Sequence, residues 1–280
     1  MMKPGTLYIV ATPIGNLEDI SIRAIRVLRE VDLIAAEDTR RTKILLKHHS
    51  IGTRLTSFHD HNEREKTPLL IAKLFDGSDV ACVSDAGTPG VSDPGYLLVK
   101  EAAARGIDVV AVPGPSALVS ALSVSGLPMD SFVFHGFPPS RSARRRRFFE
   151  SLAGETKTMV FFESPMRIQA SLRDMLEIFG DRDISLSREL TKLHEETRRG
   201  HIGELVETLE HEPPKGEITL VVAGRETATP RLSPDEIWSR YTTAIAGDAV
   251  STRDAVAAVA RETGMPKREI YEIVLIRSRK

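Results

Sequence analysis

The sequence predicts an α/β fold made of two α/β domains, followed by a small C-terminal segment of three helices. Short apolar runs typical of buried strands alternate with helical patterns over most of the 280 residues. The character of the chain changes around 128–140, where a Phe-, Pro- and Arg-rich stretch begins. Past a Pro- and Thr-containing stretch at 226–234, only helical patterns remain. We therefore divide the chain into residues 1–128, 129–225 and 226–280.

The first domain has the pattern of a mostly parallel sheet. Strands are expected at 7–11, 31–36, 80–83 and 108–112, with helices at 20–28, 42–48, up to 75, 96–105 and 116–125. Three of these strands end in Pro- and Gly-containing loops, TPIGN at 12–16, SDAGTPG at 84–90 and PGPS at 113–116. One such loop is as well explained by an ordinary tight turn. Because ligands of open α/β sheets bind beyond the carboxyl ends of strands, three of them favour a ligand site.

The second domain and the C-terminal segment are predicted from the same kinds of local pattern. Strands are expected at 158–162, 184–187 and 217–223, with a helix at 167–179. Residues 226–234 resemble a linker; Ser233 then caps one helix, Ser251 or Thr252 caps the next, and Pro266 opens the last. Residues 255–271 have the pattern of a helix-turn-helix, which indicates either nucleic-acid contact or an ordinary helical hairpin.

Composition excludes several classes of protein. The single cysteine, Cys82, lies in an apolar run, so it predicts a buried thiol and is consistent with a reducing cytoplasm. The first residues form a strand pattern, and no run approaches the roughly 18 apolar residues of a membrane span. The motifs of dinucleotide-binding, P-loop and serine-hydrolase sites are absent. We expect a cytoplasmic protein without a membrane segment.

Three charged clusters are candidate functional sites. The first comes directly after a strand and contains Glu37, Asp38, Arg40 and Arg41. Burying these charged groups costs free energy unless they contact solvent or a ligand. Five arginines in 141–147 are either a solvated helix start or a phosphate-binding site; positive charge there opposes the helix dipole, which favours the second explanation. The His-Asp-His sequence at 59–61 is a weak metal motif, and we predict hydrogen-bonded loop residues, substrate contacts or a general base at His59, and no metal.

Taken together, seven motifs in order resemble the tetrapyrrole-methylase superfamily. They are TPIGNLEDI (12–20), AAEDTRRT (35–42), HDHNE (59–63), VSDAGTPGVSDPG (83–95), PGPSA (113–117), ESPMR (163–167) and RELTK (188–192). Within the superfamily, the chain is similar to the branch that methylates small-subunit ribosomal RNA. The resemblance covers about residues 5–225. At Gly90-Val91 the chain departs from it, because branch members more often carry a larger aliphatic residue there.

The resemblance implies two α/β domains with S-adenosylmethionine in the cleft between them, and a homodimer. It implies methyl transfer to the ribose 2′-oxygen of a cytidine in the decoding region of 16S rRNA, either free or in the small ribosomal subunit. The residues that it places at the cofactor are Pro13, Gly15, Asp85, Ala86, Gly87, Thr88, Ser116, Ala117, Glu163 and Leu190.

The chemistry of the reaction suggests roles for the remaining charged residues. The sulfonium charge disappears toward the transition state, so a carboxylate against sulfur would favour the ground state. We therefore expect carboxylates to serve the acceptor hydroxyl, and the candidate bases are Asp38, Glu37 and His59, in that order. Cations would hold the RNA phosphates, namely Arg40, Arg144, Arg145, Arg146, Arg147 and Lys192.

Two other functions remain open at this point. A methyltransferase acting on a small tetrapyrrole, uroporphyrinogen or a precorrin, would also use arginines, to bind the carboxylates of its substrate. The C-terminal helices and the arginine run are better suited to a large polyanion. A non-catalytic nucleic-acid-binding protein would leave the three strand-end loops without a role.

Overall fold

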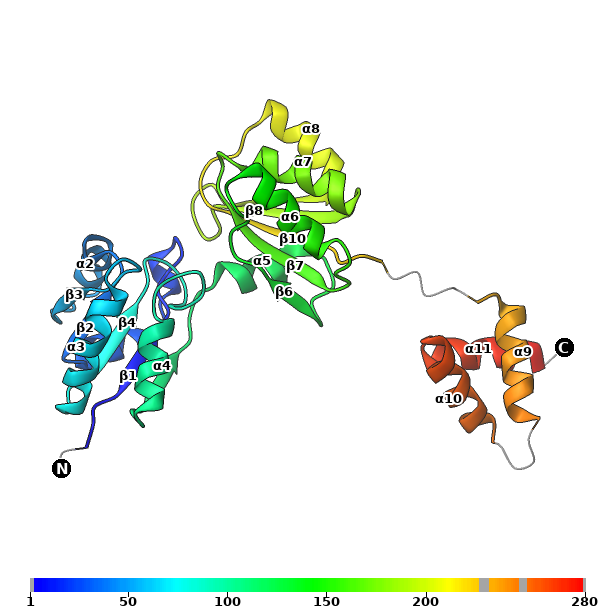
Figure 1. Ribbon diagram of the computed structural model, residues 1–280, viewed down its shortest axis with the longest axis horizontal. Coiled ribbons are helices and arrows are strands. Elements are labelled where there is room, and N and C mark those ends of the chain that lie inside the picture. The colour runs from blue at the N-terminus through cyan, green and yellow to red at the C-terminus, as the bar shows by residue number, and fades with distance from the viewer. Residues whose placement is uncertain (1–2, 227–231, 247–250, 279–280) are drawn as a thin grey trace. The chain divides into compact units, whose positions relative to one another are not determined.

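The structure is a computed structural model that describes residues 3–226, 232–246 and 251–278 (Figure 1). The chain divides into two compact units, Met1–Arg225 and Glu226–Lys280. The first unit contains two five-stranded sheets, and the second contains helices. The described part of the chain has no helix that is both long and apolar enough to span a bilayer.

The first sheet is fully parallel, as the alternation of strands and helices predicts. Its order is β3-β2-β4-β1-β5, from β1 (Leu7–Val10), β2 (Leu33–Ala36), β3 (Leu55–Ser57), β4 (Val80–Val83) and β5 (Val109–Val112). Strand β3 was not predicted from the sequence, because three half-buried residues leave little periodicity to detect. The short helix η1 (Leu17–Asp19) follows the loop after β1. The three inner strands β1, β2 and β4 are covered on both faces and consist almost wholly of apolar residues.

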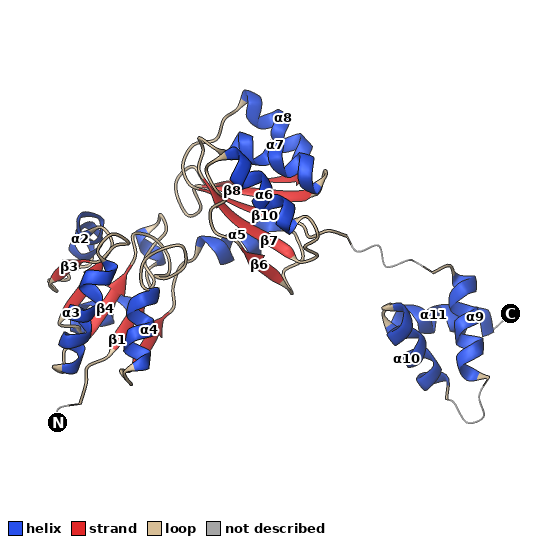
Figure 2. Cartoon of the chain, viewed as in Figure 1, coloured by secondary structure: helices blue, strands red, loops and turns tan. Residues whose placement is uncertain are grey.

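Helices cover both faces of this sheet (Figure 2). Helices α1 (Ile22–Glu30) and α2 (Thr39–His48) contribute to one apolar core, and α3 (Glu63–Phe75) and α4 (Tyr96–Ala104) contribute to the core on the other face. Cys82 belongs to the second core and is a free, fully buried thiol, which confirms that prediction. The packing holds the strands in place, and the loops that follow them lie at their carboxyl ends.

The second sheet is mixed, and most of its strand pairs are antiparallel. Its order is β6-β7-β10-β8-β9, from β6 (Phe132–Phe134), β7 (Thr158–Glu163), β8 (Asp183–Arg188), β9 (Glu196–His201) and β10 (Ile218–Val222). Only β6 and β7 are parallel among the described pairs. Strand β9 was not predicted from the sequence, because its residues, ETRRGH, include no apolar side chain.

Different helices pack on the two faces of the second sheet. Helices α6 (Ser142–Leu152), α7 (Ile168–Phe179) and α8 (Ile202–His211) share a core with alternate residues of the sheet. Helix α5 (Ala117–Ser125) packs on the opposite face, where Ala121 and Leu122 contact Val160 and Val221. The helix that follows the first sheet in the chain therefore packs against the second sheet.

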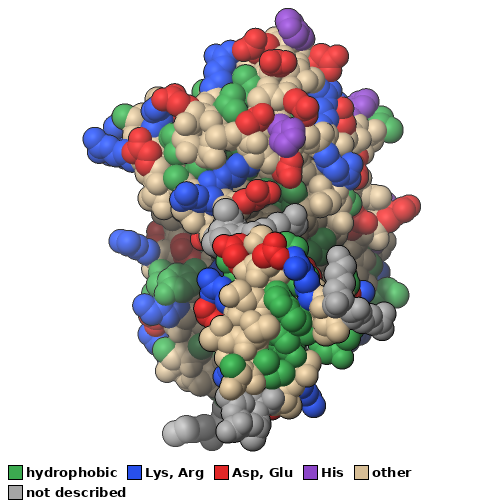
Figure 3. All heavy atoms as spheres, turned by 90° about the vertical axis from the view of Figure 1, so that its right-hand side faces the viewer, with side chains coloured by type: hydrophobic (Ala, Val, Ile, Leu, Met, Phe, Trp, Pro, Cys, Tyr) green, Lys and Arg blue, Asp and Glu red, His purple; other side chains and the backbone are tan. Residues whose placement is uncertain are grey.

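The C-terminal unit has a core of its own, formed by α9 (Pro234–Ile245), α10 (Thr252–Thr263) and α11 (Lys267–Ser278). The predicted caps are present: Ser233 forms a capping box with Glu236, and Ser251, rather than Thr252, caps α10. Of the predicted linker at 226–234, residues 227–231 lie outside the described residues. Acidic and basic side chains are interspersed over the face drawn in Figure 3, in keeping with a net charge of −1.

Candidate functional site at the carboxyl edge of the parallel sheet

Two of the three strand-end loops are hydrogen-bonded to each other. Thr12 and Gly87 form an isolated antiparallel bridge, in which each backbone N–H donates to the carbonyl of the other at 2.9 and 3.0 Å. The Thr12 hydroxyl donates to the carbonyl of Ser84 at 3.0 Å. Gly87 has a φ of +81°, a conformation that glycine adopts without strain. The loops after β1 and β4 therefore form one rigid wall.

A cavity of about 290 Å³ lies against this wall. One side consists of the loops after β1 and β4 and the start of α5, and the other of the loop after β6 together with β7, β10 and their flanking loops. The cavity is lined by Ile14, Ala86, Gly87, Thr88, Val91, Ser92, Asp93, Ser116, Ala117, Phe137, Phe162, Glu163, Ser164, Pro165, Gly216, Glu217, Ile218 and Thr219. Six of the residues predicted at the cofactor line it: Ala86, Gly87, Thr88, Ser116, Ala117 and Glu163.

The other four residues predicted at the cofactor, Pro13, Gly15, Asp85 and Leu190, are not part of the cavity lining. Gly15 lies against the loop after β8: a Cβ on it would come within 2.4 Å of Lys192 Cγ and 2.9 Å of Thr191 Oγ1. Leu190 is buried and packs in the same apolar cluster as Ile14. Gly15 and Leu190 therefore help to join the two halves of the first unit.

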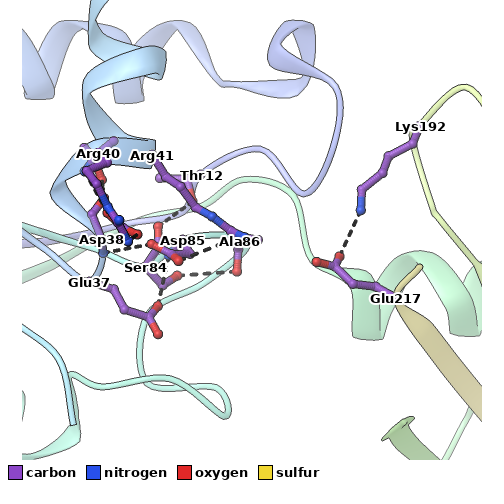
Figure 4. Close-up of polar contacts among 11 residues, drawn as sticks. Thr12, Glu37, Asp38, Arg40, Arg41, Ser84, Asp85, Ala86, Lys192 and Glu217 are labelled. Carbon is purple, nitrogen blue, oxygen red and sulfur yellow. Dashed lines mark hydrogen bonds and ion pairs between the residues drawn. The ribbon is translucent and has the colours of Figure 1, made fainter. Parts of the chain in front are cut away.

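Asp85 links the two carboxylates that follow β2. Its Oδ1 accepts the backbone N–H of Asp38 at 2.9 Å, and its own N–H donates to Glu37 Oε2 at 3.1 Å. Arg41 lies 3.5 Å from the other Asp85 oxygen. Asp38 in turn caps α2 and is paired with Arg40 at 2.7 Å. Figure 4 shows these side chains gathered at the ends of neighbouring strands.

The surroundings of Glu37 and Asp38 shift their pKa values in opposite directions. Hydrogen bonds from the Arg40 side chain and backbone hold the pKa of Asp38 well below its usual range. Burial, followed by the charge of Asp85, raises the pKa of Glu37 in spite of the N–H that it accepts from Asp85. A base that is paired and strongly acidic accepts a proton poorly, so this geometry argues against placing Asp38 first among the candidate bases.

Residues of the HDHNE motif at 59–63 form hydrogen bonds that hold neighbouring loops in place. The His59 N–H donates to Asn62 Oδ1 at 2.9 Å, and its Nε2 lies 3.2 Å from Asn62 Nδ2. Glu63 Oε1 accepts the N–H groups of Gly95 and Leu97 at 3.0 and 3.2 Å, which satisfies the start of α4. His59 does not line the cavity. Among the described residues, no group of three or more His, Cys, Asp and Glu side chains is arranged to hold a metal ion.

Asp93 is the titratable group with a raised pKa among the cavity-lining residues that the sequence analysis did not predict. It lies in the VSDPG stretch after β4, lines the cavity and is half-buried. Burial, reinforced by the charge of Glu37, raises its pKa to about 7. The only signal in the sequence was its place in the motif at 83–95, because the burial comes from residues distant in the chain.

Two arginines of the run at 141–147 are bound to acids of α7. Arg145 is buried and its Nε donates to Asp174 at 2.8 Å, while Arg146 is paired with both Asp174 and Glu177, at 3.2 and 2.5 Å. Helix α7 thus supplies the acids that the run lacks. This argues against phosphate binding by Arg145 and Arg146, and leaves Arg144 and Arg147 exposed.

Lys192 is likewise paired, within the first unit. Its Nζ lies 2.9 Å from Glu189 and 3.3 Å from Glu217 (Figure 4). Burial acts to lower the pKa of Lys192, but the two carboxylates outweigh it and the pKa is raised. Lys192 is therefore a fixed positive charge next to Glu217, which lines the cavity.

Comparisons with known proteins agree with this architecture. Residues 6–206 match the family described as Tetrapyrrole (Corrin/Porphyrin) Methylases. A protein of Halalkalibacterium halodurans named Ribosomal RNA small subunit methyltransferase I is 46% identical over 275 residues, which cover 96% of this chain and 94% of the relative. A relative of the same name from Thermotoga maritima is 53% identical over 222 residues, covering 79% of this chain and the whole of the relative.

Solved structures show the same fold at low sequence identity. Uroporphyrin-III-C-methyltransferase from Thermus thermophilus is 23% identical with a TM-score of 0.56, and covers 78% of this chain and 94% of that one. A diphthine synthase is 16% identical with a TM-score of 0.60, and covers 78% and 90%. These likenesses concern the fold alone.

Proposed function

Because the chain belongs to the tetrapyrrole (corrin/porphyrin) methylase family, we propose that it uses S-adenosylmethionine to methylate small-subunit ribosomal RNA, at the 2′-oxygen of a cytidine ribose in the decoding region. The observation that carries the proposal is the cavity at the strand ends, bordered by carboxylates on the side of β2 and β4. The names of the relatives support RNA as the substrate.

The residues around the cavity suit S-adenosylmethionine. Ser116 and Ala117 begin α5, and no side chain caps this helix, so its first N–H groups are available for a carboxylate. Ile14, Phe137, Phe162 and Ile218 provide apolar walls for a ring and methylene groups. The cavity thus combines an anion site with apolar surface.

The bound cofactor supplies a methyl group on a positively charged sulfur. The protein's part is to align the acceptor oxygen with that methyl group, and the rigid wall formed by Thr12 and Gly87 serves this purpose. The acceptor hydroxyl must also lose its proton. Glu37 and Asp93 are the carboxylates at this edge whose pKa values are raised, so the proton is transferred on their side of the cavity.

Helix α2 offers a surface for RNA phosphates beside the site. Arg40, Lys43 and Lys47 are exposed and recur at helical spacing on one face, and the helix contains no acidic residue. The ion pairs of α2 among the described residues are Arg40 with Asp38 and Arg41 with Asp85, so Lys43 and Lys47 have no carboxylate within 4 Å in the part of the chain described. Together with Arg144 and Arg147, this stripe replaces the predicted arginine cluster as the proposed RNA contact.

The test is methylation with labelled S-adenosylmethionine of three substrates: assembled small subunits, naked 16S rRNA and uroporphyrinogen. We expect label in RNA, recovered as 2′-O-methylcytidine. Label in the macrocycle alone would overturn the proposal in favour of a tetrapyrrole methyltransferase, a function that the fold allows. The same preparations, measured by light scattering, test the predicted homodimer.

A further inference from the structure

The carboxylates at the edge of the first sheet differ in what they are bonded to. Glu37, Asp38, Asp85 and Glu63 each accept at least one backbone N–H of a neighbouring loop or helix, at distances of 2.8 to 3.2 Å. Each of these therefore holds a loop in place. Asp93 accepts no backbone N–H and pairs with no Lys or Arg among the described residues; the neighbouring Ser84 hydroxyl, which favours its charged form, donates to the carbonyls of Ala86 and Gly87 at 3.4 Å. The fold does not use this carboxylate as a structural anchor.

Asp93 is nevertheless held in a defined place. Ser92, before it, has a φ of +63°, a conformation that residues other than glycine rarely adopt. Two residues later, Gly95 has a φ of +138°, and its N–H is bound by Glu63. Backbone strain of this kind persists only where the surroundings impose it, and it is common at functional sites. The loop presents Asp93 to the cavity together with Gly87 and Thr88.

The charges that act most strongly on Asp93 are negative. Glu37, Asp85 and Asp60 approach it from the loops after β2, β4 and β3. Across the cavity, Glu163 is bound by Arg167 and Ser171, and Glu217 by Lys192. No Lys or Arg belongs to the cavity lining that the structure describes. Asp93 therefore faces the cavity as a carboxylate that no cation neutralises.

We propose that Asp93 is the general base of the methyl transfer and takes the proton of the acceptor hydroxyl. The inference rests on the proposed function. As the hydroxyl oxygen forms its bond to the methyl carbon, Asp93 receives the hydroxyl proton, and the electrons of the breaking carbon–sulfur bond return to sulfur. The products are a methyl ether, a neutral thioether and protonated Asp93, which then releases its proton to water.

The environment of Asp93 suits this role. Burial and the charge of Glu37 raise its pKa to about 7, so it is a stronger base than an ordinary carboxylate and is still largely ionised slightly above neutral pH. Asp38, whose pKa is lowered by Arg40, lacks this property. Glu37 shares it, but its Oε2 is occupied by the N–H of Asp85.

The test is the Asp93→Asn variant of the full chain, assayed on small subunits and in calorimetric binding of S-adenosylhomocysteine. We expect kcat to fall 100-fold or more, in line with the range for general-base catalysis, while the Kd for S-adenosylhomocysteine changes less than about threefold. The acid limb of the pH–rate profile should disappear, and Asp93→Glu should restore part of the activity. Asp60→Asn, which removes a neighbouring exposed carboxylate, should stay within about threefold of the unmodified protein.

Each other outcome has a definite meaning. Full activity of Asp93→Asn with an unchanged pH profile overturns the inference and leaves the proposed function intact. A loss seen only as weaker S-adenosylhomocysteine binding also overturns it, and makes Asp93 a cofactor contact. If the unmodified protein methylates no RNA, the proposed function and the inference fall together. Thermal melting of each variant, with Asp93→Ala as a second substitution, separates a folding defect from a catalytic one.

Discussion

The charged residues around the two sheets of the first unit differ in whether they have partners of opposite charge. At α6 and α7, over the second sheet, Arg145 and Arg146 are paired with Asp174 and Glu177 at 2.5 to 3.2 Å. At the carboxyl edge of the first sheet, acids from three loops converge and Asp93 has no cation. In sequence both clusters look like candidate binding sites, and Asp93 does not stand out in either of them. The comparison shows that a buried or half-buried charged group is available for function only if the fold has not already given it a partner.

The buried arginine pair should have the largest effect on stability. Arg145→Ala would leave Asp174 buried without its closest partner, and we expect the free energy of unfolding to fall by about 3–5 kcal/mol. Arg144→Ala, the exposed neighbour on the same helix, should change it by less than about 0.5 kcal/mol. Urea denaturation measures both. Equal effects of the two substitutions would contradict the assignment of Arg145 to a structural role.

The second largest expected effect is the loss of RNA affinity when the lysines of α2 are neutralised. We expect Lys43→Gln with Lys47→Gln to weaken binding of 16S rRNA about tenfold at low salt, and to reduce the slope of log K against log salt by roughly 0.7–0.9 for each lysine. Lys73→Gln with Lys100→Gln removes the same charge from α3 and α4, which cover the other face of the sheet, and should leave the slope unchanged. Filter binding over a salt series makes the comparison. A slope that changes equally in both double variants would show that α2 is not the RNA surface.

Asp93 should also affect how stability depends on pH. Its pKa is about 7 in the folded protein against an ordinary 3.8, so from about pH 4 to 7 the unfolded chain releases a proton that the folded chain retains. The stability contributed by this group is therefore complete below pH 4 and is lost as the pH rises to about 7. Relative to the unmodified protein, Asp93→Asn should gain about 1 kcal/mol between pH 4 and pH 8, a modest value because water screens a partly exposed carboxylate.

Denaturation curves at both pH values measure that gain. A stability difference between Asp93→Asn and the unmodified protein that is the same at pH 4 and pH 8 would mean that the pKa of Asp93 is not raised by folding.

The smallest expected effect is the chemical labelling of Cys82, which lies inside the first sheet. Burial raises its pKa to about 12, so the thiolate that alkylating reagents attack is nearly absent at pH 8. We expect no labelling by iodoacetamide in the native protein and complete labelling in urea, read by mass spectrometry. Rapid native labelling would show that the β4 region opens readily.

Local patterns in the sequence determined much of the fold. The parallel first sheet follows from alternating strands and helices, the buried Cys82 from its apolar run, and the caps Ser233 and Ser251 from residue types that bind N–H groups three residues away. The strand-end loops could be recognised as ligand loops, because Gly and Pro mark them locally. Six of ten predicted cofactor residues line the cavity for this reason.

The remaining features were decided by tertiary structure, since their partners are distant in the chain. Arg145 meets Asp174, 29 positions later, and Glu63 binds the N–H of Gly95, 32 positions later. The polar edge strand β9 is held by pairing with β8, because its own residues give no strand signal. The environment of Asp93 depends on Glu37 and Asp60, which other strands bring to the same edge. Burial and charge are sums over neighbours in space, and a single sequence does not show which neighbours those are.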